Sequence, residues 1–460
     1  LVVGGGPSGL GAALGAAHAG ASVILVERFG FLGGNATAAL VMPLMSFHNE
    51  VRAAREHQWD GEDPRILPTD HGPGEPVVAG PLNDLLERLF PVGGAVPPTH
   101  ETGYTVPFDP ECYKLATLDM LDDAGVRFLF HAFASGVLAK RTVDGVVFET
   151  KSGPVVLTAG AVVDCTGDGD VAAAAGAPYE LGRETDGLTQ PMTLMFRMVQ
   201  FDRDRFTGYV REHPEQWRGV SGLWELVAEA HAAGELELPR DDILFFATPH
   251  PHEVSVNSTR VTGIGNDVWD LTHAEWRTRR QMREIVRFLR KRVPGFEDAY
   301  DAQSGVSVGV RETRRIRGEY RLTGDDVLTA RKFEDAIARG SYPVDIHDPE
   351  GKGTILKRIP VSEAYDIPLR CLLPREVDRL LVAGRCISGS HEAHSSYRVT
   401  PIAMATGHAA GITAALAARS DRSPRDVPHI DVQRELLRQG AILRPEIRSA
   451  LEEEGEAVGR

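Results

Sequence analysis

The chain begins with Leu1-Val2-Val3-Gly4-Gly5-Gly6-Pro7-Ser8-Gly9, an apolar run followed at once by glycines in the spacing G-x-G-x-x-G. Small residues at 7–19 predict a helix, and residues 22–26 predict a second buried strand that ends at Glu27. The first glycine of this motif permits a tight turn, the second lets the backbone approach a pyrophosphate, and the third lets helix and strand pack closely. Glu27 stands where a carboxylate commonly binds a ribose hydroxyl. The segment therefore predicts a dinucleotide site on a Rossmann-like α/β domain, without separating NAD from FAD, and no G-K-[ST] follows that would make it a P-loop.

Two later stretches have the same strand-and-glycine character. Residues 161–170 read A-V-V-D-C-T-G-D-G-D and predict a core strand that ends in a Thr-Gly turn. Residues 380–388 read L-L-V-A-G-R-C-I-S and predict another buried strand with a glycine at its end. A long helix of small residues is expected to follow, with Thr400 as its N-cap and Pro401 at its first helical position.

The order of these motifs resembles the FAD-dependent oxidoreductase family of glutathione-reductase-like fold. The motifs are G-x-G-x-x-G, the acid, G-G-N-A-T at 33–37, Thr-Gly-Asp at 166–168, V-A-G-R-x-I-S at 382–388 and R-V-x-P-x-x-M-A-x-G-x-A-A-G at 398–411. The resemblance runs nearly end to end and implies an α/β fold, in which a glutathione-reductase-type FAD-binding domain carries an inserted α+β substrate domain. The cofactor-binding residues that it implies are Gly4, Gly6, Pro7, Ser8, Gly9, Glu27, Arg28, Gly33, Gly34, Thr37, Asp164, Gly167, Gly384, Arg385, Ala403 and Gly407. One of these departs from the pattern, because many relatives of this fold have an acidic residue where this chain has Arg385.

The chain divides as follows on this interpretation. Residues 1–45, 108–190 and 365–425 form the discontinuous FAD-binding domain, and residues 191–364 form the substrate or cap domain. Residues 46–107, rich in Pro, Gly, Glu and His, are predicted to be an insertion or lid with weak internal order. Residues 426–460 are expected to be a peripheral C-terminal segment. Helices are predicted at 110–124, 272–293 and 325–338, and strands at 126–131, 143–150, 192–199, 243–246 and 253–259.

Two segments hold candidate catalytic residues. Residues 390–398 join the last strand to the last helix, and the resemblance places this loop beside the flavin. His391 or His394 could take a substrate proton, and Arg398 could hold a carboxylate or polarise an oxygen. The alternative is that these groups only hydrogen-bond the cofactor or the loop. No metal is expected, because the two histidines are spaced i,i+3 rather than the i,i+4 of zinc proteases. The other candidate, Arg314, belongs to an Arg/Glu cluster at 311–315, which suits an anionic substrate or a structural ion-pair network equally well.

The predicted function is that of an FAD-dependent dehydrogenase or oxidase, which transfers a hydride between a small organic substrate and flavin N5. A flavin monooxygenase and an FAD-containing electron-transfer subunit of a larger complex remain as alternatives. The four cysteines lie far apart and no second G-x-G-x-x-G follows a strand, which argues against a disulfide reductase, an Fe–S centre or a dedicated NAD(P)H domain. The electron donor or acceptor therefore stays unassigned.

Composition limits the partners and the location. The net charge of −15 argues against nucleic-acid binding. The apolar run at 10–25 is too short and interrupted to span a membrane, and it has no basic leader or cleavage site of a signal peptide. We expect a cytoplasmic protein with a small-molecule substrate, and assembly into a homo-oligomer stays open.

Overall fold

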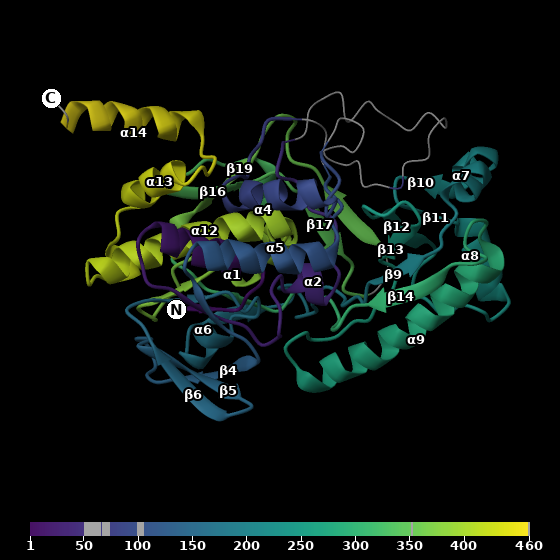
Figure 1. Cartoon of the computed structure of the whole chain (residues 1–460), viewed down its shortest axis with the longest axis horizontal. Coiled ribbons are helices and arrows are strands. Elements are labelled where there is room, and N and C mark those ends of the chain that lie inside the picture. The colour runs from purple at the N-terminus through teal and green to yellow at the C-terminus, as the bar shows by residue number, and fades with distance from the viewer. Residues whose placement is uncertain (50–65, 67–73, 99–104, 351–352, 459–460) are drawn as a thin grey trace.

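The computed structural model (Figure 1) describes residues 1–49, 66, 74–98, 105–350 and 353–458. One of its sheets has five strands. The strand order is β20-β7-β1-β2-β3, and every neighbouring pair is parallel. The strands are β1 (Val2–Val3), β2 (Ile24–Val26), β3 (Arg127–Leu129), β7 (Val162–Asp164) and β20 (Leu380–Val382). Segments from the start, middle and end of the chain thus bring their carboxyl ends to one edge, where parallel α/β sheets bind ligands.

Two helices from opposite ends of the chain pack on this sheet (Figure 1). They are α1 (Pro7–His18) and α12 (Thr400–Arg419), and their backbones touch. A Cβ atom at Gly407 would lie 1.9 Å from the carbonyl oxygen of Ser8, and one at Gly11 would lie 2.2 Å from that of Met404. Close packing therefore explains the small residues of both helices. Of the helices in the described ranges, α12 alone is long and apolar enough to cross a membrane; 83% of its apolar window is buried inside the protein, and a core helix passes the same test.

An antiparallel sheet, one further long helix and several short helices and turns complete this part of the molecule. The sheet consists of β4 (Ala132–Val137), β5 (Gly145–Thr150) and β6 (Gly153–Thr158). Helix α5 (Pro110–Asp123) begins at Asp109, whose carboxylate accepts hydrogen bonds from the backbone of Glu111 and Cys112. Short helices and turns lie between the longer elements: α2 (Asn35–Ala38), α6 (Asp170–Ala174), η3 (Leu369–Cys371), η4 (Gly384–Cys386), α11 (His391–Tyr397) and η5 (Pro424–Asp426).

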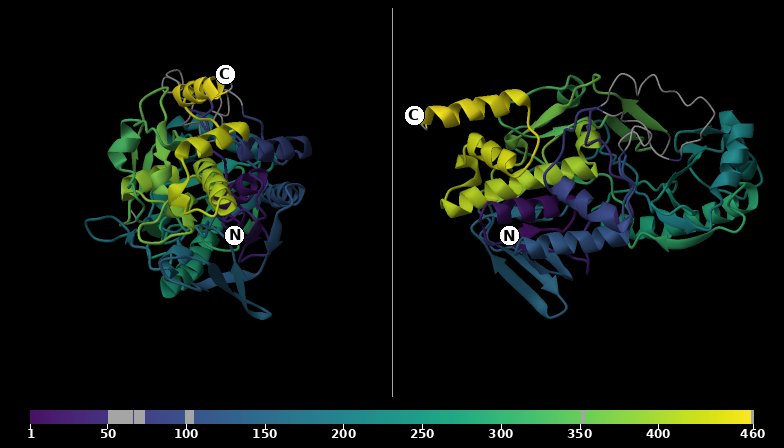
Figure 2. Two further views of the ribbon diagram at one scale, coloured as in Figure 1. Left: turned by 90° about the vertical axis from the view of Figure 1, so that its left-hand side faces the viewer. Right: turned by 45° about the horizontal axis from the view of Figure 1, so that its top comes forward.

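The opposite end of the molecule has its own core (Figure 2). A six-stranded antiparallel sheet has the order β10-β11-β12-β13-β9-β14. Its strands are β9 (Phe196–Val199), β10 (Trp217–Arg218), β11 (Ser221–Gly222), β12 (Ile243–Ala247), β13 (Glu253–Val256) and β14 (Tyr300–Ser304). Helices α7 (Arg203–Glu212), α8 (Trp224–Ala232) and α9 (Val268–Arg292) and the turn η2 (Pro214–Gln216) surround it. Tilted and edge-on rings of Phe201, Phe206, Phe245 and Phe296 fill this core.

The predicted helix at 325–338 is wrong. The structure has a short helix α10 (Gly324–Leu328), which begins with a capping box between Thr323 and Asp326. Ala330 has a φ of 51°, in the left-handed region that ends a helix. The chain then forms the strand β16 (Ala336–Gly340), which pairs with β19 (Tyr365–Pro368). Two further short ladders are β17 (Val344–His347) with β18 (Thr354–Lys357), and β15 (Arg314–Ile316) with β8 (Tyr179–Leu181).

The predicted insertion at 46–107 is better ordered than expected where it is described. Helix α4 (Pro81–Leu89) buries four leucines at helical spacing and is followed by η1 (Phe90–Val92). Residues 50–65, 67–73 and 99–104 of this predicted segment lie outside the described residues. At the C-terminal end, α13 (His429–Arg438) packs on α12, and α14 (Pro445–Val458) follows it. The domain boundaries given above stay predictions.

Candidate functional site

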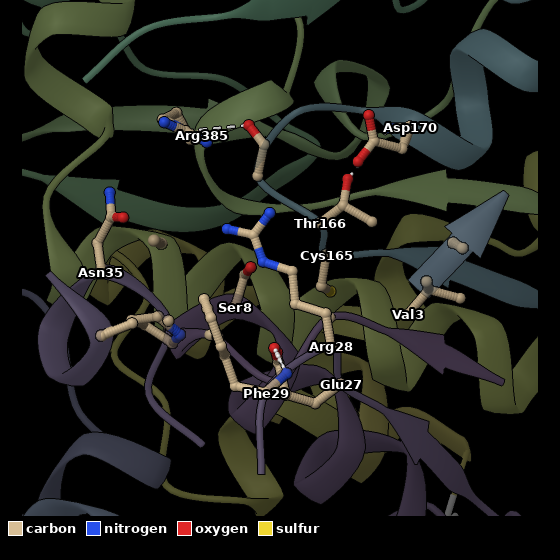
Figure 3. Close-up of a pocket in the computed structure, with 18 of the residues that line it drawn as sticks. Val3, Ser8, Glu27, Arg28, Phe29, Asn35, Cys165, Thr166, Asp170 and Arg385 are labelled. Atoms are coloured by element: carbon tan, nitrogen blue, oxygen red, sulfur yellow. Dashed lines mark hydrogen bonds between the residues drawn. The ribbon is translucent and has the colours of Figure 1, made fainter. Parts of the chain in front are cut away.

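The N-terminus of α1 opens on a cavity of about 140 Å³ (Figure 3). Gly6 is the N-cap and no described side chain caps this end, so the first N–H groups are free to bind an anion. A Cβ atom at Gly6 would meet only the Cα of Gly34, at 3.7 Å, and otherwise open space. Gly4 has a φ of +102°, and a Cβ atom there would lie 2.4 Å from the carbonyl oxygen of Cys165. The glycines thus form a cradle of backbone against which a pyrophosphate can lie.

Two charged residues, Glu27 and Arg28, follow β2 and line this cradle. The Glu27 carboxylate accepts hydrogen bonds from the N–H groups of Gly5 at 2.6 Å and Phe29 at 2.9 Å, and its burial raises its pKa. The side chain of Arg28 extends into the middle of the cavity (Figure 3). Among the described residues no carboxylate forms an ion pair with Arg28, whose guanidinium lies near the Phe29 ring. Arg28 therefore offers an unpaired positive charge to a phosphate.

Most of the predicted cofactor-binding residues line this cavity. They are Gly4, Gly6, Pro7, Ser8, Glu27, Arg28, Gly34, Gly167, Arg385 and Ala403. Arg385 stands where many relatives of this fold have an acidic residue. Its guanidinium donates hydrogen bonds to the carbonyl oxygens of Gly167 and Val310 and to the Asp168 carboxylate. Arg385 therefore clamps the Thr-Gly turn to the segment before β15.

The other predicted cofactor-binding residues shape the walls instead of lining the cavity. Gly9 and Gly407 allow close backbone contacts, since a Cβ atom would lie 1.8 Å from the Gly4 oxygen and 1.9 Å from the Ser8 oxygen, respectively. Asp164 accepts hydrogen bonds from Thr166 and from the backbone of Ala172, and burial raises its pKa to about 6. The remaining residues of this group are Gly33 and Thr37, which contact each other, and Gly384, which packs on the Ser8 side chain.

Sequence reasoning missed several residues of the same cavity. They are Val3, Val26, Phe29, Asn35, Ala38, Ala132, Phe133, Ala134, Cys165, Thr166, Asp170, Ser307, Arg398 and Thr400. Of these, Arg398 was predicted only as a catalytic residue. The run 132–134 could have been found, because it follows β3 at the carboxyl edge of the sheet. Ser307 follows β14 and carries no sequence signal.

A second, larger cavity of about 1130 Å³ adjoins the first. Asn35, Arg385, Arg398 and Thr400 line both cavities, so these four residues mark where they meet. We call the larger cavity the chamber. Its other walls come from α8, β12, β17, β18 and the segment 309–311. A chamber of this size can enclose a whole small organic molecule.

Arginines from distant parts of the sequence converge on the chamber. They are Arg240, Arg260, Arg311, Arg385 and Arg398, and they face Asp241, Asp242, Asp345, Glu350 and His347. Two ion pairs lie within the chamber, Arg240 with Asp242 at 2.9 Å and Arg398 with Asp345 at 3.4 Å. The pKa of Arg260 is lowered to about 10 and that of Arg311 to about 9, first by burial and then by neighbouring arginines.

Two predicted catalytic histidines line neither cavity. Residues 391–397 form helix α11 instead of a loop, with Ser390 as its N-cap. His394 is fully buried, neither ring nitrogen has a hydrogen-bond partner among the described residues, and burial lowers its pKa well below the ordinary value. The Nδ1 atom of His391 lies 2.9 Å from the Glu312 carboxylate, which also pairs with the buried Arg315. Both histidines therefore belong to the core.

The two arginines predicted to be catalytic, Arg314 and Arg398, lie in different surroundings. Arg314 pairs with Asp170 at 2.8 Å and donates to the carbonyl oxygen of Asp168, and it lines neither cavity. Arg314 is thus part of a structural ion pair on β15, whereas Arg311 of the same cluster lines the chamber. Arg398 alone of the four predicted catalytic residues reaches both cavities.

Comparison with known proteins gives the family. The chain is similar to a geranylgeranyl bacteriochlorophyll reductase-like protein from Thermoplasma acidophilum, with 14% identity over 94% of this chain and 81% of that one, at a TM-score of 0.45. It is similar to an anhydrotetracycline hydroxylase from Streptomyces rimosus, with 12% identity over 98% and 66% of the two chains, at a TM-score of 0.41. No curated protein matches the chain. Residues 1–436 match the family model described as FAD dependent oxidoreductase. The chain therefore belongs to the FAD-dependent oxidoreductase family, and its cofactor is FAD.

Proposed function

We propose that this FAD-dependent oxidoreductase is a dehydrogenase or oxidase for a small organic substrate held in the chamber. The observation that carries the proposal is the junction of the two cavities at Asn35, Arg385, Arg398 and Thr400. A dinucleotide that begins at the α1 cradle would direct its far end toward this junction, next to the chamber.

The residues of the smaller cavity fit FAD. The uncapped N-terminus of α1 and the open space at Gly6 suit a pyrophosphate, and Arg28 has a charge that no described carboxylate neutralises. The N-terminus of α12 reaches the junction through Thr400, where the helix dipole stabilises negative charge. When bound, FAD supplies the two-electron acceptor, which takes a hydride at its N5 atom.

Asp345 is the proposed proton acceptor. Its carboxylate lines the chamber, accepts a hydrogen bond from the Tyr342 hydroxyl at 2.8 Å and lies 3.4 Å from a guanidinium nitrogen of Arg398. Arg398, the partner of Asp345, also lines the smaller cavity and so lies at the junction. Asp345 would therefore take the proton of a substrate hydroxyl or amine while Arg398 and Tyr342 hold its carboxylate in place.

The test is anaerobic reduction of the bound flavin. The holoenzyme is mixed with a panel of alcohols, amines and organic acids, and loss of the visible flavin absorption is followed in a stopped-flow instrument. At least one compound should bleach the flavin. In Asp345→Asn this step should slow by about 10²-fold or more at unchanged FAD content. Asp242→Asn, another chamber aspartate, is the matched control and should keep the rate.

Other outcomes would replace the proposal. If NAD(P)H alone reduces the flavin and oxygen is then consumed with an organic co-substrate, the protein is a monooxygenase. If only a protein partner exchanges electrons with the flavin, it is an electron-transfer subunit. An unchanged rate in Asp345→Asn would remove that residue as the proton acceptor.

A further inference from the structure

In the described part of the chain, Arg311 forms hydrogen bonds through one of its terminal nitrogens, Nη1. Its Nη1 atom donates to the carbonyl oxygen of Pro191 at 2.6 Å and to the hydroxyl of Thr193 at 2.5 Å. These two bonds use both Nη1 hydrogens and fix the plane of the guanidinium. Its Nε and Nη2 atoms have no hydrogen-bond partner among the described residues. The free edge is the pair of parallel donors that binds the two oxygens of a carboxylate.

The charge of Arg311 also lacks a partner. Within the described ranges, no carboxylate lies at ion-pair distance from it. The other chamber arginines differ: Arg240, Arg385 and Arg398 each pair with an aspartate, and Arg260 donates to Gly353 and His347. The pKa of Arg311, lowered to about 9 by burial, still leaves the group charged at neutral pH. An anionic ligand would offset the cost of an unpaired charge that is partly removed from water.

His347 adds a second donor beside Arg311. An Arg260 Nη2 atom lies 3.1 Å from His347 Nδ1, and since a guanidinium can only donate, Nδ1 accepts this bond. The neutral ring therefore has its hydrogen on Nε2. That atom is 3.6 Å from the Asp345 carboxylate, beyond hydrogen-bond distance. Burial and then the charge of Arg311 lower the pKa of His347 well below the ordinary value, which keeps the ring neutral.

We infer that the chamber binds its substrate by a carboxylate group, which lies on the Nε–Nη2 edge of Arg311 with the Nε2–H of His347 as a further donor. That the bound carboxylate is the substrate rests on the proposed function, whereas binding of an anion at this site does not depend on turnover. The two parallel donors of Arg311 match the spacing of carboxylate oxygens, which favours a carboxylate over a neutral amide of the same shape.

Binding to the oxidised holoenzyme tests this inference without catalysis. Sodium benzoate and sodium octanoate are each titrated against their amides, benzamide and octanamide, and inorganic phosphate is a separate arm. The readouts are the shift of the visible flavin spectrum and the thermal midpoint. At least one carboxylate should bind at least about 10-fold more tightly than its amide. This preference should fall by about 10- to 100-fold in Arg311→Gln, as expected when a charged hydrogen bond is lost.

Two variants act as controls. Arg240→Gln removes a chamber arginine that is already paired with Asp242, and the carboxylate preference should persist. Arg311→Lys keeps the charge without the parallel donors and should bind carboxylates with intermediate affinity. If Arg311→Gln fails to hold FAD, Arg311→Lys decides: unchanged carboxylate affinity would overturn the inference.

The remaining outcomes are also decisive. The inference is wrong if no carboxylate is preferred over its amide, if the preference survives in Arg311→Gln, or if phosphate binds more tightly than both carboxylates. If a neutral compound reduces the flavin and no carboxylate is preferred, the proposed function stands and the anion site fails. If carboxylates bind through Arg311 but no compound reduces the flavin, the anion site stands and the proposed function fails.

Discussion

Substitution of Gly6 should abolish FAD binding without preventing folding. Gly6 has a φ of −72°, which any residue adopts, and a Cβ atom there meets only Gly34 at 3.7 Å. The first carbon of a valine side chain therefore has room in the folded protein. The side chain would occupy the space where the pyrophosphate approaches the backbone. Gly6→Val should consequently fold, with loss of its glycine N-cap costing about 1 kcal/mol or less, and should lose FAD.

The size of the effect follows from linkage. FAD at a free concentration of about 100 times its Kd stabilises the folded state by about 2.7 kcal/mol. An unfolding entropy of roughly 2.1 cal/mol/K per residue, over 460 residues, amounts to about 1 kcal/mol/K. Added FAD should therefore raise the thermal midpoint of the wild-type protein by about 3 °C, and that of Gly6→Val by almost nothing.

Gly9→Ala is the matched comparison. A Cβ atom at Gly9 would lie 1.8 Å from the carbonyl oxygen of Gly4, so the backbone itself must move. This variant should lower the midpoint of the apo-protein, which Gly6→Val should leave within about 1 °C. Calorimetry of the apo-proteins with and without FAD, together with the flavin content after purification, measures both effects. A folded Gly6→Val protein with wild-type flavin content would refute the cradle.

Three further predictions concern titratable groups. Asp345→Asn should keep FAD and slow its reduction by substrate by about 10²-fold or more, in stopped-flow absorbance. His391→Ala and His394→Ala should lower the unfolding free energy by about 1–3 kcal/mol, because His391 loses its contact with Glu312 and both substitutions leave a cavity in the core. Holoenzyme reduction should stay within about 3-fold of wild type, and a larger slowing in either variant would return that histidine to the active site. Burial lowers the pKa of His408 to about 4, below its unfolded value of about 6.5, so the unfolded state takes up the proton first and stability falls between these two pH values. His408→Gln should reduce this loss by up to about 3 kcal/mol in denaturant titrations at pH 7 and pH 4, and an unchanged pH dependence would show that another group causes it.

The sequence alone determined the cofactor half of the protein. Backbone geometry at a phosphate site allows only glycine at certain positions, so the G-x-G-x-x-G spacing and the following Glu27 are visible without tertiary information. The same holds for the small residues of α12, because a helix that touches another backbone to backbone cannot carry larger side chains at Gly407 and Gly411. These local requirements predicted a dinucleotide site, and the order of the motifs along the chain, through its resemblance to the family, predicted FAD.

Only the tertiary structure decided the substrate half. His391 and His394 stand beside the flavin motif in sequence, yet α11 turns both into the core, whereas Arg398 on the same segment reaches the junction. Arg311 and Asp345 belong to a chamber whose walls come from α8, β12, β17 and the start of α12. Whether a polar side chain is buried with a partner or faces a cavity depends on elements packed from far along the chain. No local pattern encodes that choice, because the same residue types serve in ion pairs, in the core and at the site.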